Sequence, residues 1–162
     1  MTRSTSPIIR EARAEDLPTL LDFEQALIAY ERPFAPNLRK DKISYYDLSA
    51  YIKAENIRVV VAEIGGELVG SGYALIKENK AYKAPQYYVY LGFMYVIPEY
   101  RGQGINGKIM NDLIDWGKAH GYTEVQLEVY AENESAIKAY AKAGLVPEIL
   151  TMRLDNIPTE NQ

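Results

Sequence analysis

The sequence predicts an α/β fold of the α+β type, in which helices flank a mixed, mostly antiparallel central sheet. Two β-rich runs, residues 57–64 and 67–76, meet at Gly65-Gly66, a pair that accepts the positive φ angles of a tight turn. A third long β-rich run follows at residues 86–96. Beyond Gly104 the apolar residues recur at a helical period, with one further strand between two helices. An antiparallel first half and a second half with crossover helices are therefore expected to share one sheet.

The N-terminal part of the chain is predicted to contain one strand and two helices. Residues 8–12 have the composition of a short strand. Asp16 is expected to cap a helix in which apolar positions recur at helical spacing from Leu17 to Ile28. Pro33 and Pro36 then interrupt the pattern, and residues 43–53 are expected to form a second, weaker helix.

The strand at residues 86–96 leads into the longest predicted helix of the second half. Pro98 should end the strand because proline has no N–H to donate, and Gly92 indicates a bulge or a close approach of the backbone. The helix is expected to begin after Gly104 and to end at His120-Gly121. One face of this helix is apolar and should pack on the sheet: Ile105, Ile109, Leu113 and Trp116.

The C-terminal part supplies the remaining predicted elements. Residues 123–130 are expected to form a strand, and residues 134–143 a helix with Asn133 as N-cap and Gly144 just beyond its end. Residues 145–154 are expected to close the sheet with strands around Pro147. The order is β-α-α-β-β-β-α-β-α-β without a repeat or linker, so residues 1–162 are predicted to form a single domain.

Composition excludes several classes of function. The 162-residue chain is 48% hydrophobic and 25% charged, as in ordinary globular proteins, and no apolar run approaches the roughly 20 residues of a membrane span. With its polar start, we expect a cytoplasmic protein without a membrane partner. The chain has no cysteine and a single histidine, His120. A nucleophilic cysteine is therefore excluded, and a Ser-His-Asp triad or a multi-histidine metal site has little to build on. A net charge of −4 without a Lys/Arg block argues against nucleic acid and favours a cationic small substrate.

Residues 96–107 are predicted to bind a diphosphate group. Gly102, Gly104 and Gly107 lie within six residues, between a strand and the start of a helix. Small residues let backbone N–H groups approach a ligand closely, and the helix N-terminus favours anions. A glycine-rich turn that merely joins strand to helix would explain one or two glycines, but not three beside Arg101.

The same glycines match the dinucleotide fingerprint Gly-x-Gly-x-x-Gly, with Glu124 or Glu128 near the position of a ribose-binding acid. A dinucleotide fold would place the first glycine almost at the end of a strand in a parallel sheet. Here residues 98–101 intervene, and the preceding strands form an antiparallel hairpin. The context therefore argues against a nicotinamide cofactor.

The segment resembles the acetyl-CoA-binding motif of the GNAT acetyltransferase superfamily, Arg/Gln-x-x-Gly-x-Gly/Ala. Arg101 and Gly104 match the motif, whereas Asn106 stands where the family usually has glycine or alanine. Residues 127–145 resemble a second block of the family, Asn-x-x-Ala-x-x-x-Tyr-x-x-x-Gly-Phe, with Leu145 in place of the phenylalanine. Two blocks at family spacing extend the resemblance over nearly the whole chain.

The resemblance implies that acetyl-CoA is the cosubstrate and that it lies at a splay between two central strands. Backbone donors of Met94, Tyr95 and Val96 would lie beside the pantetheine arm and polarise the thioester carbonyl. The diphosphate would rest on the segment that follows: Arg101, Gly102, Gln103, Gly104, Ile105, Asn106 and Gly107.

The resemblance also implies catalytic roles. Tyr140 holds the position of the general acid that protonates the departing CoA sulfur, although a core or surface tyrosine is the alternative. Asn133 would cap its helix and contact the cofactor, or only cap it. Glu128 is the candidate base, because some relatives place theirs in this strand, and its alternative is a glutamate that faces solvent or a lysine. Glu24 or Glu31 could act through water instead.

The expected reaction is direct transfer of an acetyl group to a primary amine of a small molecule or peptide. The acceptor would lie between residues 31–51 and the Tyr-rich strand, in contact with Glu31, Tyr45 and Tyr90. Aromatic walls with a few carboxylates suit an ammonium group. A GNAT-like module that binds acyl-CoA without turnover is the alternative function, and a homodimer is compatible with the sequence.

Overall fold

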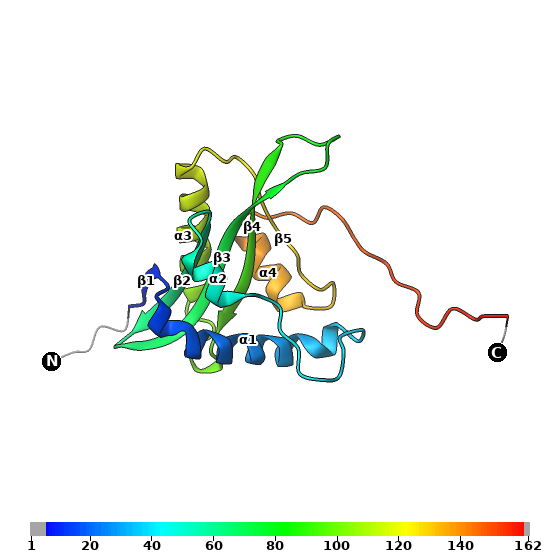
Figure 1. Cartoon of the computed structure of the whole chain (residues 1–162), viewed down its shortest axis with the longest axis horizontal. Coiled ribbons are helices and arrows are strands. Elements are labelled where there is room, and N and C mark those ends of the chain that lie inside the picture. The colour runs from blue at the N-terminus through cyan, green and yellow to red at the C-terminus, as the bar shows by residue number, and fades with distance from the viewer. Residues whose placement is uncertain (1–5, 161–162) are drawn as a thin grey trace.

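Five strands form one open sheet in the computed structural model, which describes residues 6–160 (Figure 1). The strands lie in the order β1-β2-β3-β4-β5, and the first four pair antiparallel in succession. β5 joins β4 in parallel. The predicted mixed, mostly antiparallel sheet is therefore confirmed. The strand bounds are Ile8–Glu11, Ile57–Ile64, Glu67–Glu78, Tyr87–Val96 and Val125–Leu127.

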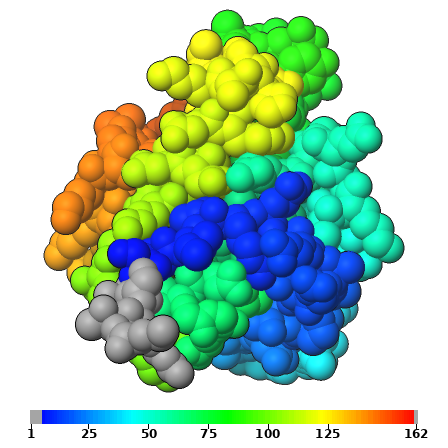
Figure 2. Space-filling model, turned by 90° about the vertical axis from the view of Figure 1, so that its left-hand side faces the viewer, coloured from blue at the N-terminus to red at the C-terminus, as the bar shows by residue number. Residues whose placement is uncertain are grey.

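Four α-helices flank the sheet: α1 (Leu17–Glu31), α2 (Leu48–Lys53), α3 (Ile105–Ala119) and α4 (Glu134–Lys142). Side chains alternate between the two faces of β2, so Val60 and Ala62 pack with α3 while Val59 and Val61 pack with α1 and α2. The core thus has one layer on each face of the sheet. In the space-filling view of Figure 2, the N-terminal strand lies between α3 and α1. Among the described residues, no helix is both long and apolar enough to cross a membrane.

The hairpin and the distortion of β4 form where the sequence predicts them. Gly65 and Gly66 join β2 to β3 with φ angles of 56° and 84°. The β3–β4 register shifts between Ser71 and Tyr73, and Phe93 on β4 has a φ of 57°, which marks a bulge. A Cβ atom on Gly92 would lie 2.3 Å from the Tyr73 ring, so this position also carries a close approach. The bulge is fixed by a buried hydrogen bond of 3.0 Å from Ser71 Oγ to the Phe93 carbonyl.

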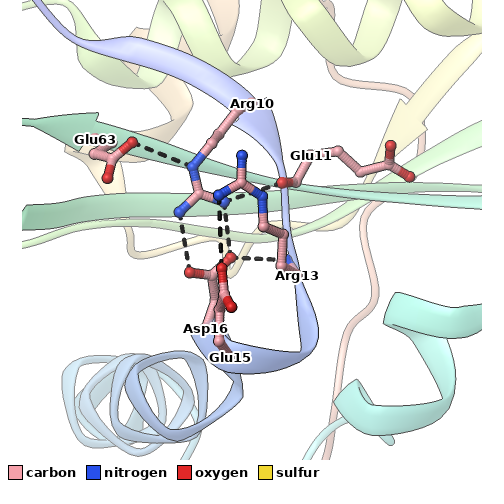
Figure 3. A network of polar contacts seen from close by, with 6 residues as sticks. All are labelled: Arg10, Glu11, Arg13, Glu15, Asp16 and Glu63. Carbon is pink, nitrogen blue, oxygen red and sulfur yellow. Dashed lines mark hydrogen bonds and ion pairs between the residues drawn. The ribbon is translucent and has the colours of Figure 1, made fainter. Parts of the chain in front are cut away.

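Asp16 occupies the predicted N-cap position of α1, but its side chain makes no capping hydrogen bond to that helix. Asp16 lies in a 3-10 turn, and its Oδ2 accepts the Arg13 N–H at 2.7 Å, three residues earlier in the chain. Its two carboxylate oxygens also accept from the Arg10 guanidinium at 2.8 and 3.0 Å, and Arg10 Nε donates to Glu63 at 3.2 Å (Figure 3). Asp16 therefore ties β1 to the start of α1 and, through Arg10, to β2.

Three predicted elements are shorter than expected or missing. Residues 43–47 are not helical, because the N–H groups of Tyr45 and Tyr46 donate to the Glu24 carboxylate at 3.0 and 2.8 Å instead of to a helix. α2 begins only at Leu48, after Asp47, whose side chain accepts the Ala50 N–H. The strand expected at residues 123–130 is limited to β5, which pairs with only three residues of β4. The closing strands expected at residues 145–154 do not form, and those residues are almost all exposed.

Candidate active site

The candidate active site lies where β4 and β5 diverge. β5 pairs with Val89 to Leu91 and then ends, whereas β4 continues to Val96. Ile97 N–H donates to Val69 on β3, so by strand alternation the peptide groups of Val96 and Met94 face away from β3. These peptide groups therefore face the side of β4 on which β5 no longer pairs with it. The predicted splay is thus present, although Tyr95 itself points its backbone toward β3 and buries its ring against Phe23.

A row of free backbone donors follows the end of β4. The chain passes through a 3-10 turn, Pro98–Tyr100, and reaches α3 through Gly102 and Gly104, both with a φ of 79°. In the described part of the chain, no backbone or side-chain acceptor binds the N–H groups of residues 102–107. These six donors lie at the N-terminus of a 15-residue helix, where an anion is favoured. A Cβ at Gly102, Gly104 or Gly107 would meet no atom within 4 Å, so the space beside them is open.

We call residues 101–107 the donor loop. Arg101 and Asn106, near its two ends, make side-chain hydrogen bonds to residues outside the loop. Arg101 Nε donates to the Val96 carbonyl at 2.9 Å, and its guanidinium lies 5.2 Å from the centre of the Tyr30 ring. Asn106 turns its amide back along α3 toward the sulfur of Met110, at 3.8 Å. The Asn106 side chain therefore leaves its own backbone N–H accessible. Gln103 is exposed and Ile105 is buried in the core.

A small pocket of about 80 Å³ lies at the splay beside the bulge. It joins residues far apart in the sequence, because α1, β4, the end of β5 and α4 all border it. Of the predicted site residues it includes Glu31, Tyr90, Met94, Glu128 and Tyr140. The remaining lining residues are Leu27, Tyr46, Leu91, Gly92, Phe93 and Leu127.

Tyr140 enters the pocket from α4. Asn133 caps this helix by accepting the Ala136 N–H at 3.4 Å, so the predicted N-cap is confirmed, and Gly144 follows the helix with a φ of 101°. Asn133 is buried, whereas Tyr140 is half-buried and packs against the core on the α3 side of the sheet. Burial raises the pKa of Tyr140 to about 12, and the nearby Glu31 carboxylate adds to this shift. The hydroxyl is therefore protonated at neutral pH.

Glu31, at the last turn of α1, is the more enclosed of the two pocket carboxylates. Burial raises its pKa above the ordinary value, with the neighbouring Tyr45 hydroxyl opposing that shift. Tyr45 Oη is buried without a hydrogen-bond partner among the described residues, so the two groups are neighbours rather than a bonded pair. Within the same part of the chain, Glu31 takes part in no ion pair. The Glu31 carboxylate, which lines the pocket, and the Tyr45 hydroxyl are therefore neighbours at the candidate site.

Glu128 lies at the mouth of the pocket and is exposed. It was expected within a strand, but β5 ends at Leu127, so Glu128 is the first residue of the diverging chain. Tyr90 forms the facing wall, and Lys77 lies 3.6 Å above the centre of its ring. Of the four tyrosines on β4, only Tyr90 lines the pocket. The aromatic wall predicted for the acceptor side is thus narrower than the sequence indicates.

Sequence reasoning missed Tyr46 and misjudged Glu24. Tyr46 lines the pocket and packs against Tyr73 and Phe93, with ring centres 5.2 and 5.4 Å apart. Glu24 is buried, its Oε2 accepts both N–H groups of the Tyr45-Tyr46 turn, and it is not among the residues that line the pocket. A glutamate on the inner face of α1, at the spacing of Leu20 and Leu27, is the signal that could have identified a buried structural carboxylate.

A larger hollow of about 530 Å³ lies elsewhere, between the start of α1 and the β2–β3 turn. It is wide and shallow, and on its wall Arg10 is engaged in ion pairs with Asp16 and Glu63 (Figure 3). None of the predicted site residues borders it. The smaller pocket at the splay is therefore the better candidate for chemistry, because two carboxylates, a tyrosine and the Met94 segment of β4 meet there.

A strand with a bulge leads through a loop of free N–H donors to the N-terminus of a long helix. The model of the acetyltransferase (GNAT) family matches residues 23–145. The chain therefore belongs to the GNAT acetyltransferase family, as the sequence predicts. It is also 32% identical over 150 residues to thialysine N-epsilon-acetyltransferase of Sus scrofa, covering 86% of this chain and 84% of that protein.

Solved structures share the fold. A point mutant of the BH1408 protein from Bacillus halodurans superposes with a TM-score of 0.82 at 22% identity, covering 93% of this chain and 99% of that one. A predicted acetyltransferase from Clostridium acetobutylicum, solved with acetyl-CoA, gives a TM-score of 0.68 at 18% identity over 92% of this chain and 96% of that one. These matches support the fold assignment across most of the sequence.

Proposed function

We propose that this protein transfers an acetyl group from acetyl-CoA directly to a primary amine of a small molecule or peptide. The observation that carries the proposal is a pocket at the splay that joins a protonated tyrosine to two carboxylates, on the strand whose end leads into six free backbone donors. Family membership supplies the reaction class, and the thialysine-acetylating relative acts on an amine.

The donor loop fits the diphosphate of acetyl-CoA. Its N–H groups are unpaired, its glycine positions open to free space, and the helix dipole favours negative charge there. The peptide groups of Met94 and the Val96 N–H, which face away from β3, would align the pantetheine arm and the thioester. Bound acetyl-CoA supplies an activated acyl carbon; the remaining steps depend on side chains of this chain.

We assign three side chains to the reaction. Glu31 would hold the amine as a cation, because an enclosed carboxylate without an ion-pair partner favours a positive charge. Glu128 would take one proton from the bound ammonium, directly or through water, so that the neutral amine attacks the acyl carbon; the nitrogen then loses a second proton. Tyr140 would donate its proton to sulfur as the carbon–sulfur bond breaks. One N–C bond forms and one C–S bond breaks; of the two protons that the ammonium nitrogen loses, one balances the proton that sulfur gains and the other is released to solvent.

Release of free CoA thiol from acetyl-CoA, measured against a panel of small amines and peptides, tests the proposal. We expect release with at least one cationic amine and a strong loss in Glu128→Gln. Glu132→Gln, an exposed change on the same connection, is the matched control and should retain activity. CoA-induced thermal stabilisation without thiol release across the panel would identify a binding module and overturn the proposal. Stabilisation by NAD but not by CoA would overturn the cosubstrate assignment as well.

A further inference from the structure

Tyr30, in the last turn of α1, contacts two other elements of the candidate site. Its ring centre lies 5.2 Å from the guanidinium of Arg101 in the donor loop. Its hydroxyl lies 3.4 Å from Ser135 Oγ in the first turn of α4. The end of α1 therefore lies beside the start of α4 (Figure 1). No step of the proposed reaction uses Tyr30, although it immediately precedes Glu31 in the chain.

The hydrogen bonds around Ser135 lead from Tyr30 to the cap of α4. Ser135 Oγ donates to Asn133 Oδ1 at 3.3 Å. A serine hydroxyl carries a single hydrogen, so the Tyr30 hydroxyl is the donor in its contact with Ser135. Asn133 Oδ1 also accepts the Ala136 N–H at 3.4 Å, and Asn133 is buried. The Tyr30 hydroxyl is thereby connected to the buried residue at which the helix of Tyr140 begins.

The Arg101 side chain turns toward α1. Its Nε donates to the Val96 carbonyl at 2.9 Å, and its guanidinium lies over both the Tyr30 ring and the Tyr95 ring, 5.8 Å from the centre of the latter. Within residues 6–160, Arg101 forms no ion pair with a carboxylate. A guanidinium over aromatic faces is held by cation–π attraction. The Arg101 side chain thus joins the end of β4 to Tyr30, while its backbone leads into the donor loop.

Tyr30 bridges the two sides of the splay. β4 and the donor loop form one side, and α4, which follows β5, belongs to the other. The Tyr30 ring is fixed from a third direction by Phe34, which packs against it edge to face with ring centres 5.8 Å apart. The end of α1 is also close to Tyr140, because Glu31 and Tyr30 add to the effect of burial in raising the pKa of that hydroxyl.

We infer, on the basis of the proposed function, that Tyr30 is a positioning residue that joins the acceptor side of the site to the cofactor side. Its hydroxyl, through Ser135, sets the distance between α1, which carries Glu31, and α4, which carries Tyr140. Its ring, through Arg101, holds the donor loop against α1. The two parts of this side chain therefore serve different steps: the hydroxyl aligns the amine with the departing sulfur, and the ring supports the binding of CoA.

Kinetic and binding measurements on substitutions of Tyr30 and Ser135 test the two roles. Tyr30→Phe deletes only the hydroxyl, so kcat should fall about fivefold, the equivalent of one hydrogen bond, while the affinity for CoA stays constant. The KM for the amine should also stay constant, because Glu31 still holds the amine. Ser135→Ala removes the same hydrogen bond from α4 and should cause the same fall in kcat. The double variant should fall no further, because the two groups share one interaction.

Two further substitutions separate positioning from a general loss of stability. Ser135→Thr keeps a hydroxyl and should retain the wild-type kcat. Tyr30→Ala deletes the ring as well, and it should in addition weaken CoA binding about threefold, because a cation–π contact at an exposed site is lost. Tyr82→Phe, at an exposed tyrosine of the β3–β4 loop, is the matched control and should change neither quantity. Tyr30 and Ser135 are both exposed, so these changes should leave folding intact.

The outcomes distinguish this role from the proposed function. A wild type that releases no thiol with any amine of the panel would overturn the proposed function, and the role of Tyr30 with it. An active wild type matched in kcat by Tyr30→Phe and Ser135→Ala would overturn the positioning role alone. Losses that add in the double variant would do the same, because the two hydroxyls would then act independently. Equal losses of kcat and CoA affinity in Tyr30→Phe, with a lower melting temperature, would assign Tyr30 to the fold instead.

Discussion

Tyr140 lines the pocket, where its hydroxyl could donate a proton, while its ring packs against the hydrophobic core. The residue packs against the core on the α3 side of the sheet and lines the pocket, so ring and hydroxyl have separable roles. Tyr140→Phe should leave thermal stability and CoA affinity almost unchanged. Because general acid catalysis contributes about 10²-fold or more, kcat should fall by roughly that factor if acetyl transfer limits the rate.

The pKa of Tyr140 sets how this loss depends on pH. Burial raises it to about 12, so the wild-type hydroxyl keeps its proton throughout the usual assay range. The ratio of wild-type to variant kcat should therefore be constant between neutral and moderately alkaline pH. Single-turnover measurements in which Tyr140→Phe matches the wild type would assign the proton to water or to another group.

Asp16 illustrates a single carboxylate that organises a junction. Its hydrogen bonds to the Arg10 guanidinium lower the pKa of the Asp16 carboxyl below its ordinary value. Asp16→Asn should lower the free energy of unfolding at neutral pH by about 2 kcal/mol, because a buried charged hydrogen bond is weakened. Glu15→Gln, at an exposed pair 3.6 Å from Arg13, should change it little.

The Asp16 contribution should vanish in acid. The native pKa lies below the unfolded value of about 3.9, so the unfolded state takes up protons first as the pH falls. The stabilisation is complete above the unfolded pKa and is lost as the pH falls through the native pKa. Urea unfolding of wild type and Asp16→Asn should therefore converge toward the lowest pH. A difference that stays constant across the acid range would argue against the ion pair as its source.

At the scale of elements, the donor loop owes its free N–H groups to two glycines in left-handed conformation. Gly104→Val should abolish CoA-induced thermal stabilisation, because a branched residue cannot hold a φ of 79° without strain and would displace the loop. Gly66→Val is a matched control: its φ is 84° and it also faces open space, but it lies in the β2–β3 turn. Both variants should lose similar stability, and only Gly66→Val should still respond to CoA. An equal response in the two would remove the loop from the binding site.

The elements differ in how far the sequence could predict them. The Gly65-Gly66 turn and the helix after Gly104 carry local signals, so their positions follow from the residues alone. Residues 43–47 could not be predicted in this way, because their path depends on Glu24, some 20 residues earlier in the chain. The segment 149–155 has a genuine strand pattern, yet a pattern does not indicate which edge it will join.

At the scale of the whole molecule, the two halves contribute different sides of the candidate site. The C-terminal half supplies the donor loop and Tyr140, whereas α1 and the turn after it supply Glu31 and Tyr45. Spacing along the sequence could place residues within each half. It could not indicate that Glu31 and Tyr140 line the same pocket, because the two residues come from helices far apart in the chain. Glu128 was predicted from its strand, and its position at the pocket mouth depends on where β5 stops.

This division predicts separate effects on the two substrates. Tyr45→Phe removes a buried hydroxyl that has no partner among the described residues, so stability should be unchanged or slightly higher. If that hydroxyl binds the acceptor, the KM for the amine should rise about fivefold, the equivalent of one hydrogen bond, while CoA affinity stays constant. Tyr51→Phe, in the neighbouring aromatic cluster, serves as control. Equal losses for amine and CoA would indicate that Tyr45 supports the fold instead.

The strand order has a consequence for the kinetics of folding. β2, β3 and β4 are joined by short connections, whereas residues 12–56 separate β1 from β2 and residues 97–124 separate β4 from β5. Closing a long loop costs more entropy before its contacts form, so the central meander should assemble first. In pulse-labelled hydrogen exchange during refolding, β3 amides should be protected before those of β1 and β5. Simultaneous protection of all five strands would mean that the long connections close as early as the hairpin. The edge strand β5, which borders the candidate active site, would then not be among the last parts to form.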